Sequence, residues 1–213
     1  VLHFGYKQMA LIRLNKVTLE FPIYNAGQLS LRHKLVQIGT GGKIAQDHSK
    51  VVIVKALQDV SIEFRDGDSV GLVGHNGAGK SSLLRILSGI YQPLDGDIIV
   101  EGSVTMLLEL GAGLDPELSG YENILRMGLL YGLTLNEAYA SFADVEEFSE
   151  LGQFLEMPVR AYSSGMMMRL MFAVATAKCP DILLVDEIIN VGDESFKQKA
   201  KARLASMAKR ASI

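Results

Sequence analysis

The sequence predicts an α/β fold in which an antiparallel β edge and an inserted α-helical subdomain flank a central core. Near the N-terminus, apolar and polar residues alternate over Leu11–Phe21 and again over Val60–Arg65, as in half-buried strands. Further along, the apolar segment Ser69–Val73 leads into a glycine-rich turn and a helix, which is typical of an α/β core. Helical patterns then fill about 118–162, before an apolar strand returns at Ile182–Val185. This order indicates one α/β domain interrupted by helices.

Composition excludes several classes of protein. The 213 residues are 48% hydrophobic and 21% charged, unlike disordered or collagen-like chains, and the one cysteine, Cys179, cannot form an internal disulfide. Because 21 Lys and Arg stand against 24 Asp and Glu, the formal net charge is −3, which gives no overall positive field for duplex nucleic acid. No apolar run reaches the roughly 18 residues of a membrane span. We therefore expect a cytoplasmic domain with no nucleic-acid partner.

The elements are expected in a fixed order along the chain. Residues 1–8 lack the apolar core of a signal peptide and are interpreted as a leader or an added extension. The insertion at 22–50, between the two antiparallel strands, is too long for a hairpin connection and is expected to hold one short helix. The remaining elements are the helix Lys80–Leu87, strands Asp97–Glu101 and Val104–Glu109, helices from Leu118 to about Arg160, a helix from Gly165, the strand Ile182–Val185 and a basic helix over about 194–210.

A glycine-rich segment between strand and helix predicts a phosphate-binding loop. Residues 74–81 fit the G-x-x-x-x-G-K-[ST] pattern in the strand-loop-helix context that the chemistry requires. Glycines let the backbone N–H groups point at phosphate oxygens, and the helix N-terminus adds the positive end of its dipole. Lys80 is predicted to lie between the β- and γ-phosphates, and Ser81 to hold Mg²⁺. The predicted nucleotide-binding residues here are Gly74, His75, Asn76, Gly77, Ala78, Gly79, Lys80, Ser81 and Ser82.

Two carboxylates follow the apolar strand at 182–185. Residues at the C-terminal ends of parallel strands lie beside the ligand in such folds, so Asp186 is predicted to contact Mg²⁺. Glu187 is predicted to polarise a water molecule that attacks the γ-phosphate. Alone, such a pair is as typical of a helix cap or a surface. Together with the phosphate loop, it predicts an ATPase in which Glu187 is catalytic and the cofactors are ATP and Mg²⁺.

The segment Tyr-Ser-Ser-Gly-Met at 162–166 begins a helix and resembles the Leu-Ser-Gly-Gly-Gln signature of the ATP-binding cassette (ABC) family. Ser163 and Gly165 match the signature, whereas its first, third and fifth positions differ. A serine here is by itself a common helix cap, but a hydroxyl and free N–H groups at a helix N-terminus also form an anion site. The resemblance extends from about residue 10 to the end and identifies 1–213 as a single ABC nucleotide-binding domain.

The family resemblance implies a P-loop NTPase core and a head-to-tail dimer with a second copy of the chain. Ser163 and Gly165 of one copy would cover the γ-phosphate held by Lys80 of the other. Asp193 matches the aspartate of the family's D-loop, although the usual Ser-Ala-Leu of that loop is absent. One chain would thus hold half of each complete site, and two ATP molecules would close the dimer.

Three features depart from the family pattern. Many members have a glutamine after the strand that follows the phosphate-loop helix, whereas this chain has Leu110 with Glu109 beside it, so Glu109 is a candidate metal ligand. The aromatic residue expected to stack on adenine is either Phe21 or Tyr24. The chain stops at Ile213, where the resemblance places the start of the strand before the switch histidine. We therefore expect a C-terminal truncation and poor hydrolysis.

Further segments resemble the ATPase subunits of bacterial polysaccharide exporters, which move O-antigen, capsular or teichoic-acid chains. They are Leu107–Leu114, Ser119–Asn123, the segment at 162–166 and the run from Asp186 to Asp193. The insertion at 22–50 also fits, since that subfamily carries an extra helix facing the transporter's entrance. This resemblance implies an integral membrane permease as partner and a peripheral location on the cytoplasmic face of the bacterial inner membrane.

Several alternatives stay open at this point. One is an ABC-type ATPase without a membrane partner, acting as a nucleotide-gated clamp on ribosomes or chromosomes; such proteins commonly fuse two cassettes or add coiled coils. Another is a remnant that binds ATP without hydrolysing it, which the intact Lys80, Asp186 and Glu187 disfavour. Locally, Gly111 and Gly113 have an alternative reading as flexible loop residues. The methionines at 166–171 predict a packed helix face, and the group Lys197, Lys199, Lys201 and Arg203 predicts a solvated one.

Overall fold

The computed structural model describes residues 9–23, 52–107, 110–111, 113–186 and 194–213. They divide into two compact units. The sheet unit comprises Arg13–Glu63 and Leu72–Ile99, and the helical unit comprises Val1–Ile12, Phe64–Gly71 and Val100–Ile213, in each case over the described residues. Residues 1–8 and almost all of the insertion at 22–50 lie outside the described residues, so their predicted roles stay predictions.

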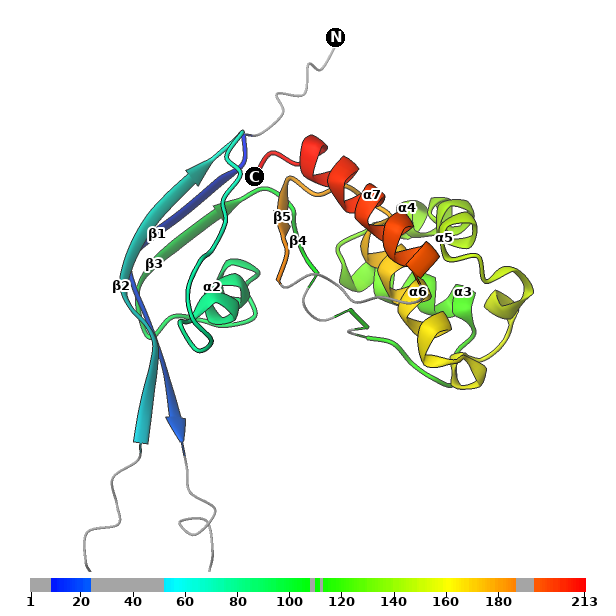
Figure 1. The fold of residues 1–213 in the computed structure, drawn as a ribbon, viewed down its shortest axis with the longest axis horizontal. Coiled ribbons are helices and arrows are strands. Elements are labelled where there is room, and N and C mark those ends of the chain that lie inside the picture. Colours follow the sequence, from blue (N-terminus) through cyan, green and yellow to red (C-terminus); the bar gives the residue numbers. More distant parts are fainter. Residues whose placement is uncertain (1–8, 24–51, 108–109, 112, 187–193) are drawn as a thin grey trace, which may run out of the picture. The chain divides into compact units, whose positions relative to one another are not determined.

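Three strands form the framework of the sheet unit. They are β1 (Leu11–Ile23), β2 (Val52–Arg65) and β3 (Asp95–Glu101), in the order β2-β1-β3. β1 and β2 run in opposite directions in Figure 1, so the predicted antiparallel edge is confirmed. β2 begins at Val52 rather than at Val60, because the alternating pattern marks only its second half.

The apolar pattern of β1 changes phase at Lys16. Ile12 and Leu14 are buried before this residue, and Val17 and Leu19 are buried after it. Lys16 has a φ of 50°, a left-handed conformation that is uncommon for residues other than glycine. Such a residue is typical of a β-bulge, in which one extra residue is inserted into a strand. The insertion lets both halves of the strand bury their apolar side chains.

Helix α2 (Lys80–Leu87) begins and ends at the predicted residues. It lies beside the sheet in Figure 1. Its buried side chains follow the spacing of an amphipathic helix, with the apolar stripe turned inward. They are Leu83, Leu84, Ile86 and Leu87.

The predicted buried strand Ser69–Val73 is wrong. Its residues have no regular secondary structure, and the side chains of Val70, Leu72 and Val73 are 50%, 37% and 99% exposed. An apolar run shows that a segment could be buried, but a strand also needs neighbours for its N–H and C=O groups. Neither sheet in the described part of the chain includes this segment.

Two short strands in the helical unit pair in parallel. β4 (Val104–Met106) and β5 (Ile182–Leu184) are aligned with Val104 opposite Ile182. The Leu107 N–H then donates to the Leu184 carbonyl at 3.0 Å, which extends the ladder. Both strands fall within the predicted ranges, and their C-terminal ends lie at the same edge.

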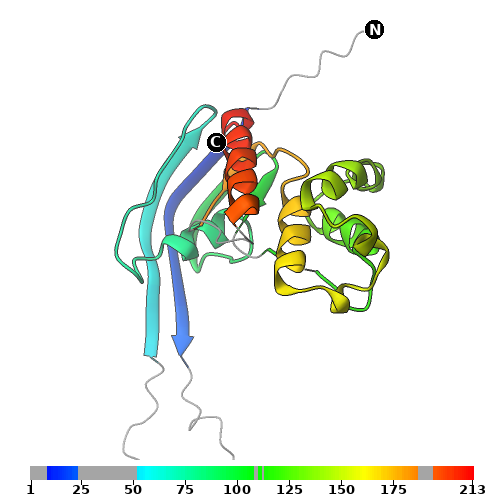
Figure 2. The same cartoon turned by 45° about the vertical axis from the view of Figure 1, so that its right-hand side comes forward.

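The predicted helices are present in the helical unit, and Figure 2 shows the green to yellow ones gathered into one bundle. Two of them begin with reciprocal capping boxes, Ser119 with Glu122 and Thr134 with Glu137, which fix their first residues. The elements are α3 (Gly120–Leu130), α4 (Leu135–Ala140), α5 (Phe142–Ser149), the 3₁₀ turns η1 (Gly152–Glu156) and η2 (Val159–Ala161), α6 (Ser164–Ala175) and α7 (Glu194–Arg210).

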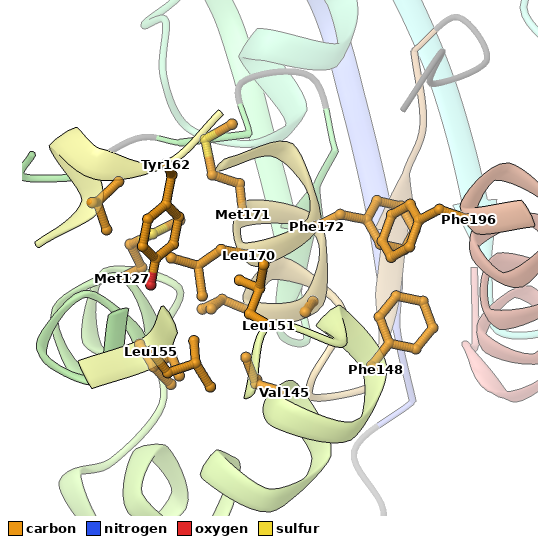
Figure 3. Packing of buried hydrophobic residues seen from close by; sticks show 14 of the residues in the cluster. Met127, Val145, Phe148, Leu151, Leu155, Tyr162, Leu170, Met171, Phe172 and Phe196 are labelled. Atoms are coloured by element: carbon orange, nitrogen blue, oxygen red, sulfur yellow. The ribbon is translucent and has the colours of Figure 1, made fainter. Parts of the chain in front are cut away.

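The core of this unit is built around three aromatic rings from three helices (Figure 3). Phe148 of α5 stacks on Phe172 of α6 at 5.8 Å between ring centroids and meets Phe196 of α7 edge to face at 5.4 Å. Leu170 and Met171 are buried in the same cluster, and the methionines at 166–168 pack against it. The predicted packed face of α6 is therefore confirmed.

The prediction of a solvated basic face on α7 is partly wrong. Arg203 forms an ion pair with Asp144 of α5, and its guanidinium lies 4.3 Å from the Phe148 ring centroid. Lys199 donates to Glu150 at 2.8 Å. Charge periodicity alone cannot distinguish solvent from an acidic neighbouring helix, and here α7 meets one. Lys201 is exposed, as predicted.

Among the described residues, no helix combines the length and hydrophobicity that a membrane crossing requires.

Candidate functional site

The phosphate loop lies in the sheet unit, immediately before α2. Gly77 and Gly79 have φ values of 84° and 90°, which residues with a side chain rarely adopt. A Cβ atom at Gly79 would lie 2.4 Å from the carbonyl oxygen of Ala56, so only glycine allows the loop to pass this close to β2. The Ala78 N–H donates to the His75 carbonyl at 3.1 Å and closes the turn.

The half-buried Lys80 side chain folds back over its own loop. Its Nζ donates to the carbonyls of Gly74 at 2.8 Å and His75 at 3.1 Å. These acceptors are neutral dipoles, whereas a phosphate oxygen carries a full charge and forms a stronger, charge-assisted bond. Lys80 is therefore held at the loop by contacts that a phosphate could replace.

The N-terminus of α2 is suited to an anion. Its N-cap, Gly79, offers no side-chain cap, and the first turn contains no acidic residue. By contrast, α3, α4 and α6 are capped by serine or threonine hydroxyls. The first N–H groups of any helix lack intrahelical acceptors, and the helix dipole favours negative charge there. The loop, with Ser81 and Ser82 in the first turn, thus fits the phosphates of a nucleoside triphosphate.

Phe21, near the end of β1, has an aromatic neighbour that the sequence did not indicate. Its ring meets that of Tyr91 edge to face, with centroids 5.3 Å apart, and the Arg85 guanidinium lies 5.8 Å from the Tyr91 centroid. Tyr91 follows α2 in the sequence, so only the tertiary fold brings it to β1. The adenine-stacking role of Phe21 stays a prediction, and Tyr24 lies outside the described residues.

The C-terminal ends of β4 and β5 lie at one edge of the helical unit, and Asp186, a predicted metal ligand, follows β5 there. Asp186 is half-buried and follows β5 by two residues, and Leu110 follows β4. Because β4 and β5 are parallel, the chain leaves both at the same edge. Glu109, Glu187 and Asp193 lie outside the described residues. Within the described ranges no three His, Cys, Asp or Glu residues form a metal-binding group, so the Mg²⁺ ligands stay predictions.

The signature-like segment begins α6 in the helical unit. Ser163 is the exposed N-cap, and its Oγ accepts a hydrogen bond from the Met166 N–H at 3.2 Å. Among the described residues, an added Cβ at Gly165 would lie within 4 Å of the Ser163 Oγ alone, at 3.9 Å. The described part of this unit therefore does not itself require glycine at 165. The segment has an exposed serine hydroxyl at a helix N-terminus, which is the kind of position where an anion can bind.

Tyr162, the first residue of this segment, points into the core instead. It is buried, and its hydroxyl donates to the Phe154 carbonyl at 2.7 Å. Burial, with a further contribution from Tyr121, raises the pKa of Tyr162 to about 12. This hydroxyl is therefore neutral at physiological pH and serves as a buried donor.

A residue of the subfamily-like segment proves to be structural. Asn123 is fully buried; its Oδ1 accepts from the Asp115 N–H at 2.8 Å, and its Nδ2 lies 2.9 to 3.1 Å from the carbonyls of Asp115, Leu118 and Ser119. One amide side chain thus closes the loop before α3. In the sequence, Asn123 is recognisable only as part of a motif, because its partners are backbone groups.

Gly111 and Gly113, which have an alternative reading as flexible loop residues, adopt a backbone conformation that favours glycine. Both have positive φ, 105° and 81°. Added Cβ atoms would lie 2.4 Å from the Met171 sulfur and 2.0 Å from a Leu130 methyl carbon, respectively. The Met171 and Leu130 side chains could move aside, so it is the backbone conformation that favours glycine at these positions.

Residues 57–190 match the family model described as "ABC transporter". The match covers more than half of the chain, which therefore belongs to the ABC transporter family. ATP hydrolysis is the activity expected of a member, so the predicted ATPase class is supported.

Several relatives have descriptive names. The chain is 56% identical over 196 residues to the O-antigen export system ATP-binding protein RfbE of Yersinia enterocolitica, covering 92% of this chain and 82% of the relative. It is 49% identical over 152 residues to the O-antigen export system ATP-binding protein RfbB of Myxococcus xanthus, which covers 71% of this chain and 35% of the relative. It is 41% identical over 149 residues to the teichoic acids export ATP-binding protein TagH of Shouchella clausii, which covers 70% of this chain and 41% of the relative. The chain thus spans less than half of the last two.

Solved structures share the fold. A dimeric, post-hydrolysis ATP-binding cassette bound to ADP and Pi matches with a TM-score of 0.65 at 18% identity, over 94% of this chain and 84% of that one. The ATP-binding subunit of an ABC transporter matches with a TM-score of 0.63 at 21% identity, over 94% of this chain and 75% of that one. At such identities the likeness shows the fold alone, and it confirms the predicted P-loop NTPase class.

Proposed function

We propose that this chain binds and hydrolyses ATP to power the export of a cell-surface polysaccharide through a separate membrane permease. The 56% identity to the Yersinia O-antigen export protein, over 92% of this chain, is the observation that carries the proposal. The named relatives act in both O-antigen and teichoic acid export, so the proposal extends to the class of polymer and not to one polymer. The loop before α2 supplies the physical basis for nucleotide binding.

Binding is assigned to the loop and the start of α2. The N–H groups at the helix N-terminus would receive phosphate oxygens, and Lys80 would exchange its bonds to Gly74 and His75 for bonds to the β- and γ-phosphates. Phe21 is the residue proposed to stack on the adenine. ATP brings a γ-phosphate that can be cleaved, and Mg²⁺ screens its charge. Ser81, Asp186 and Glu109 are the proposed ligands for the cation.

Hydrolysis is assigned to Glu187, which would accept a proton from the attacking water. Asp186 precedes it and would hold the cation through its carboxylate. Ser163 and Gly165 would be contributed by a second copy of the chain, whose α6 N-terminus would face the γ-phosphate held by Lys80. Asp193 would contact the same interface. Positioning and electrostatic stabilisation supply most of the acceleration in such phosphoryl transfers.

The membrane partner is proposed to be an integral permease, with this chain on the cytoplasmic face of the bacterial inner membrane. The insertion at 22–50 is the proposed docking segment. Joining Ile23 directly to the start of β2 through a short turn should preserve thermal stability and ATP affinity, because the described strands of the sheet unit are retained. Export should fall. Normal export by this deletion variant would refute the docking role.

The proposed function is tested in the cell that carries the gene. Deleting the gene should remove polysaccharide from the surface and leave polymer inside the cell. The parent gene, expressed with the predicted C-terminal strand and switch histidine, should restore export; Lys80→Ala in the same gene should not, because the loop loses its full positive charge. Lys201→Ala, which removes an exposed lysine of α7, is the matched control and should restore export. Normal surface polymer with defective translation or chromosome segregation would instead support the clamp alternative.

A further inference from the structure

The turn that follows α2 is held against the end of that helix. The carbonyl of Arg85, in the last turn of α2, accepts hydrogen bonds from the N–H groups of Ile90 at 2.9 Å and Tyr91 at 3.2 Å. The Arg85 guanidinium lies 5.8 Å from the Tyr91 ring centroid, a distance at which a cation and an aromatic ring attract each other. Both side chains are half-buried. The position of the Tyr91 ring is therefore tied to α2.

The same turn is also attached to β1. The Leu94 N–H donates to the Thr18 carbonyl at 2.8 Å, three residues before Phe21 in the strand. The rings of Phe21 and Tyr91 meet edge to face, with their centroids 5.3 Å apart. Such a pair is stabilising beyond the apolar area that it buries. Tyr91 therefore limits the orientations that are open to the Phe21 ring.

An edge-to-face contact suits a ring that also binds a planar ligand. In such a pair one ring offers only its edge, whereas an offset stack would cover one face of each ring. Phe21 is half-buried rather than enclosed. A side chain whose orientation is already restricted loses less conformational entropy when a ligand binds to it. Tyr91 would therefore strengthen stacking on the Phe21 ring without touching the ligand itself.

Helix α2 connects this aromatic pair to the phosphate loop. The loop leads into the helix at Lys80, and Arg85 lies at the other end of its eight residues, a length of about 12 Å. The loop, α2, the turn and Phe21 all belong to the sheet unit. The base and the terminal phosphate are at opposite ends of a nucleoside triphosphate. One chain can bind both only if the loop and the Phe21 ring keep a fixed relation, which α2 and the turn supply.

These contacts give Tyr91 a role in nucleotide binding. We propose that Tyr91 is a positioning residue, held by Arg85 at the end of α2, that orients the Phe21 ring for stacking on adenine. It thereby strengthens the part of ATP binding that depends on the base and leaves the part that depends on the phosphates unchanged. Because Tyr91 acts through Phe21, its effect disappears when Phe21 is removed. This inference rests on the proposed function, in which Phe21 is the stacking residue.

The experiment measures by calorimetry how tightly this chain binds two ligands in the presence of Mg²⁺. One ligand is adenylyl imidodiphosphate, an ATP analogue that is not hydrolysed, and the other is inorganic triphosphate, which has neither base nor sugar. The variants are Phe21→Ala, Tyr91→Ala, their combination, and Tyr91→Phe, which keeps the aromatic ring. Tyr139→Ala makes the same change at an exposed tyrosine of α4 and is the control.

We expect Phe21→Ala to weaken binding of the ATP analogue by about tenfold, as is typical when one base–aromatic stack is lost. Tyr91→Ala should weaken it by about three- to fivefold, because the Phe21 ring remains but is no longer held. The combined variant should be no worse than Phe21→Ala alone. Tyr91→Phe and Tyr139→Ala should match the parent. Affinity for inorganic triphosphate should change by less than about twofold in every variant, because none of them alters the phosphate loop.

The outcomes separate this inference from the function it rests on. If the parent does not bind the ATP analogue, nucleotide binding is wrong and both fall. If Phe21→Ala binds the analogue like the parent, Phe21 does not stack on adenine, and the role of Tyr91 falls while nucleotide binding stands.

Two results would overturn the role of Tyr91 alone: parent affinity in Tyr91→Ala, or a combined variant whose loss is the sum of the two single losses. An equal loss of affinity for both ligands in Tyr91→Ala would show a general structural defect and would also overturn it. If Tyr91→Ala does not fold, Tyr91→Leu, which keeps the apolar bulk without a ring, decides between the same outcomes.

Discussion

Replacing Asn123 with alanine should destabilise the helical unit more than most single changes. Asn123 lies in the first turn of α3 and is fully buried. Its amide accepts one backbone hydrogen bond and has three carbonyls around its two N–H hydrogens. Alanine keeps the helix but offers none of these bonds. The Asp115 N–H and the surrounding carbonyls would then lose their partner.

The magnitude follows from the number of bonds. The amide has two hydrogens to donate and one acceptor in use, so about three bonds are lost, each worth about 1 kcal/mol net, with an added cost for the orphaned buried groups. We therefore expect a loss of about 3 to 4 kcal/mol in the free energy of unfolding. With a urea slope of about 2 kcal/mol per molar, the unfolding midpoint should fall by about 1.5 to 2 M.

Asn123→Asp tests the direction of the donors. Aspartate keeps the size and the acceptor but would place a carboxylate against three carbonyl oxygens. Burial and these dipoles should raise its folded pKa above the unfolded value of about 3.9. A raised folded pKa contributes stability below the unfolded pKa that is lost as the pH rises through the folded one. The deficit relative to the parent should therefore be largest at neutral pH and shrink in acid.

The assay is urea unfolding followed by far-ultraviolet circular dichroism, at neutral and acid pH. Asn136→Ala, the same change at an exposed position of α4, is the control and should lie within about 0.5 kcal/mol of the parent. ATP affinity should not change in either variant, since the loop lies in the sheet unit. A midpoint for Asn123→Ala close to that of Asn136→Ala, or an Asn123→Asp deficit that grows in acid, would refute the reasoning.

Three other single contacts can each be tested with one substitution. Gly79→Ala should lower MgATP affinity, measured by calorimetry, about tenfold or more, because the added Cβ would clash with the Ala56 carbonyl. Gly89→Ala is the control: Gly89 also has a positive φ, but no described atom lies within 4 Å of an added Cβ, so the affinity should not change. Glu137, whose pKa is lowered to about 2 chiefly by Lys178, contributes stability above its usual pKa of 4.5 that is lost as the pH falls toward 2. In thermal melts the deficit of Glu137→Gln should therefore vanish near pH 2. Tyr162, with a pKa of about 12, contributes stability below pH 10 that is lost as the pH rises through 12, and Tyr162→Phe should lack this alkaline transition in unfolding followed against pH.

The sequence predicted those helices and strands whose ends are determined by residues close to them in the chain. The start of α2 at Lys80 follows from glycines that only a turn needs, and the start of α6 follows from a serine that caps its own helix. The strand at 182–184 was predicted from a short apolar run that is followed by two acidic residues, Asp186 and Glu187. In each case the residues that decide the structure lie within a few positions of the element itself.

Features that depend on distant partners could not be predicted in this way. The contact of Phe21 with Tyr91 joins residues far apart in the chain, and the docking of Arg203 needs an acidic helix that charge periodicity cannot reveal. The apolar run at 69–73 shows the same limit in reverse, since its composition permits burial but nothing local supplies a neighbouring strand. The roles of Glu109, Glu187 and Asp193 rest on sequence resemblance, because these residues lie outside the described part of the chain.

The departures of this chain from the ABC signature differ in their physical meaning. Tyr162 replaces the first residue of the signature, and its buried hydroxyl is already bonded to the Phe154 carbonyl, so the exchange serves the packing of the helical unit. Met166 at the fifth position packs against the same core. The structure does not explain Ser164 at the third position, which is exposed. The two residues that match the signature, Ser163 and Gly165, do not serve packing in this way. Ser163 is exposed, and the described residues leave space for a Cβ atom at Gly165. Gly165, which the described part of its own unit does not require, therefore stays the predicted contact with a phosphate held by a second copy of the chain.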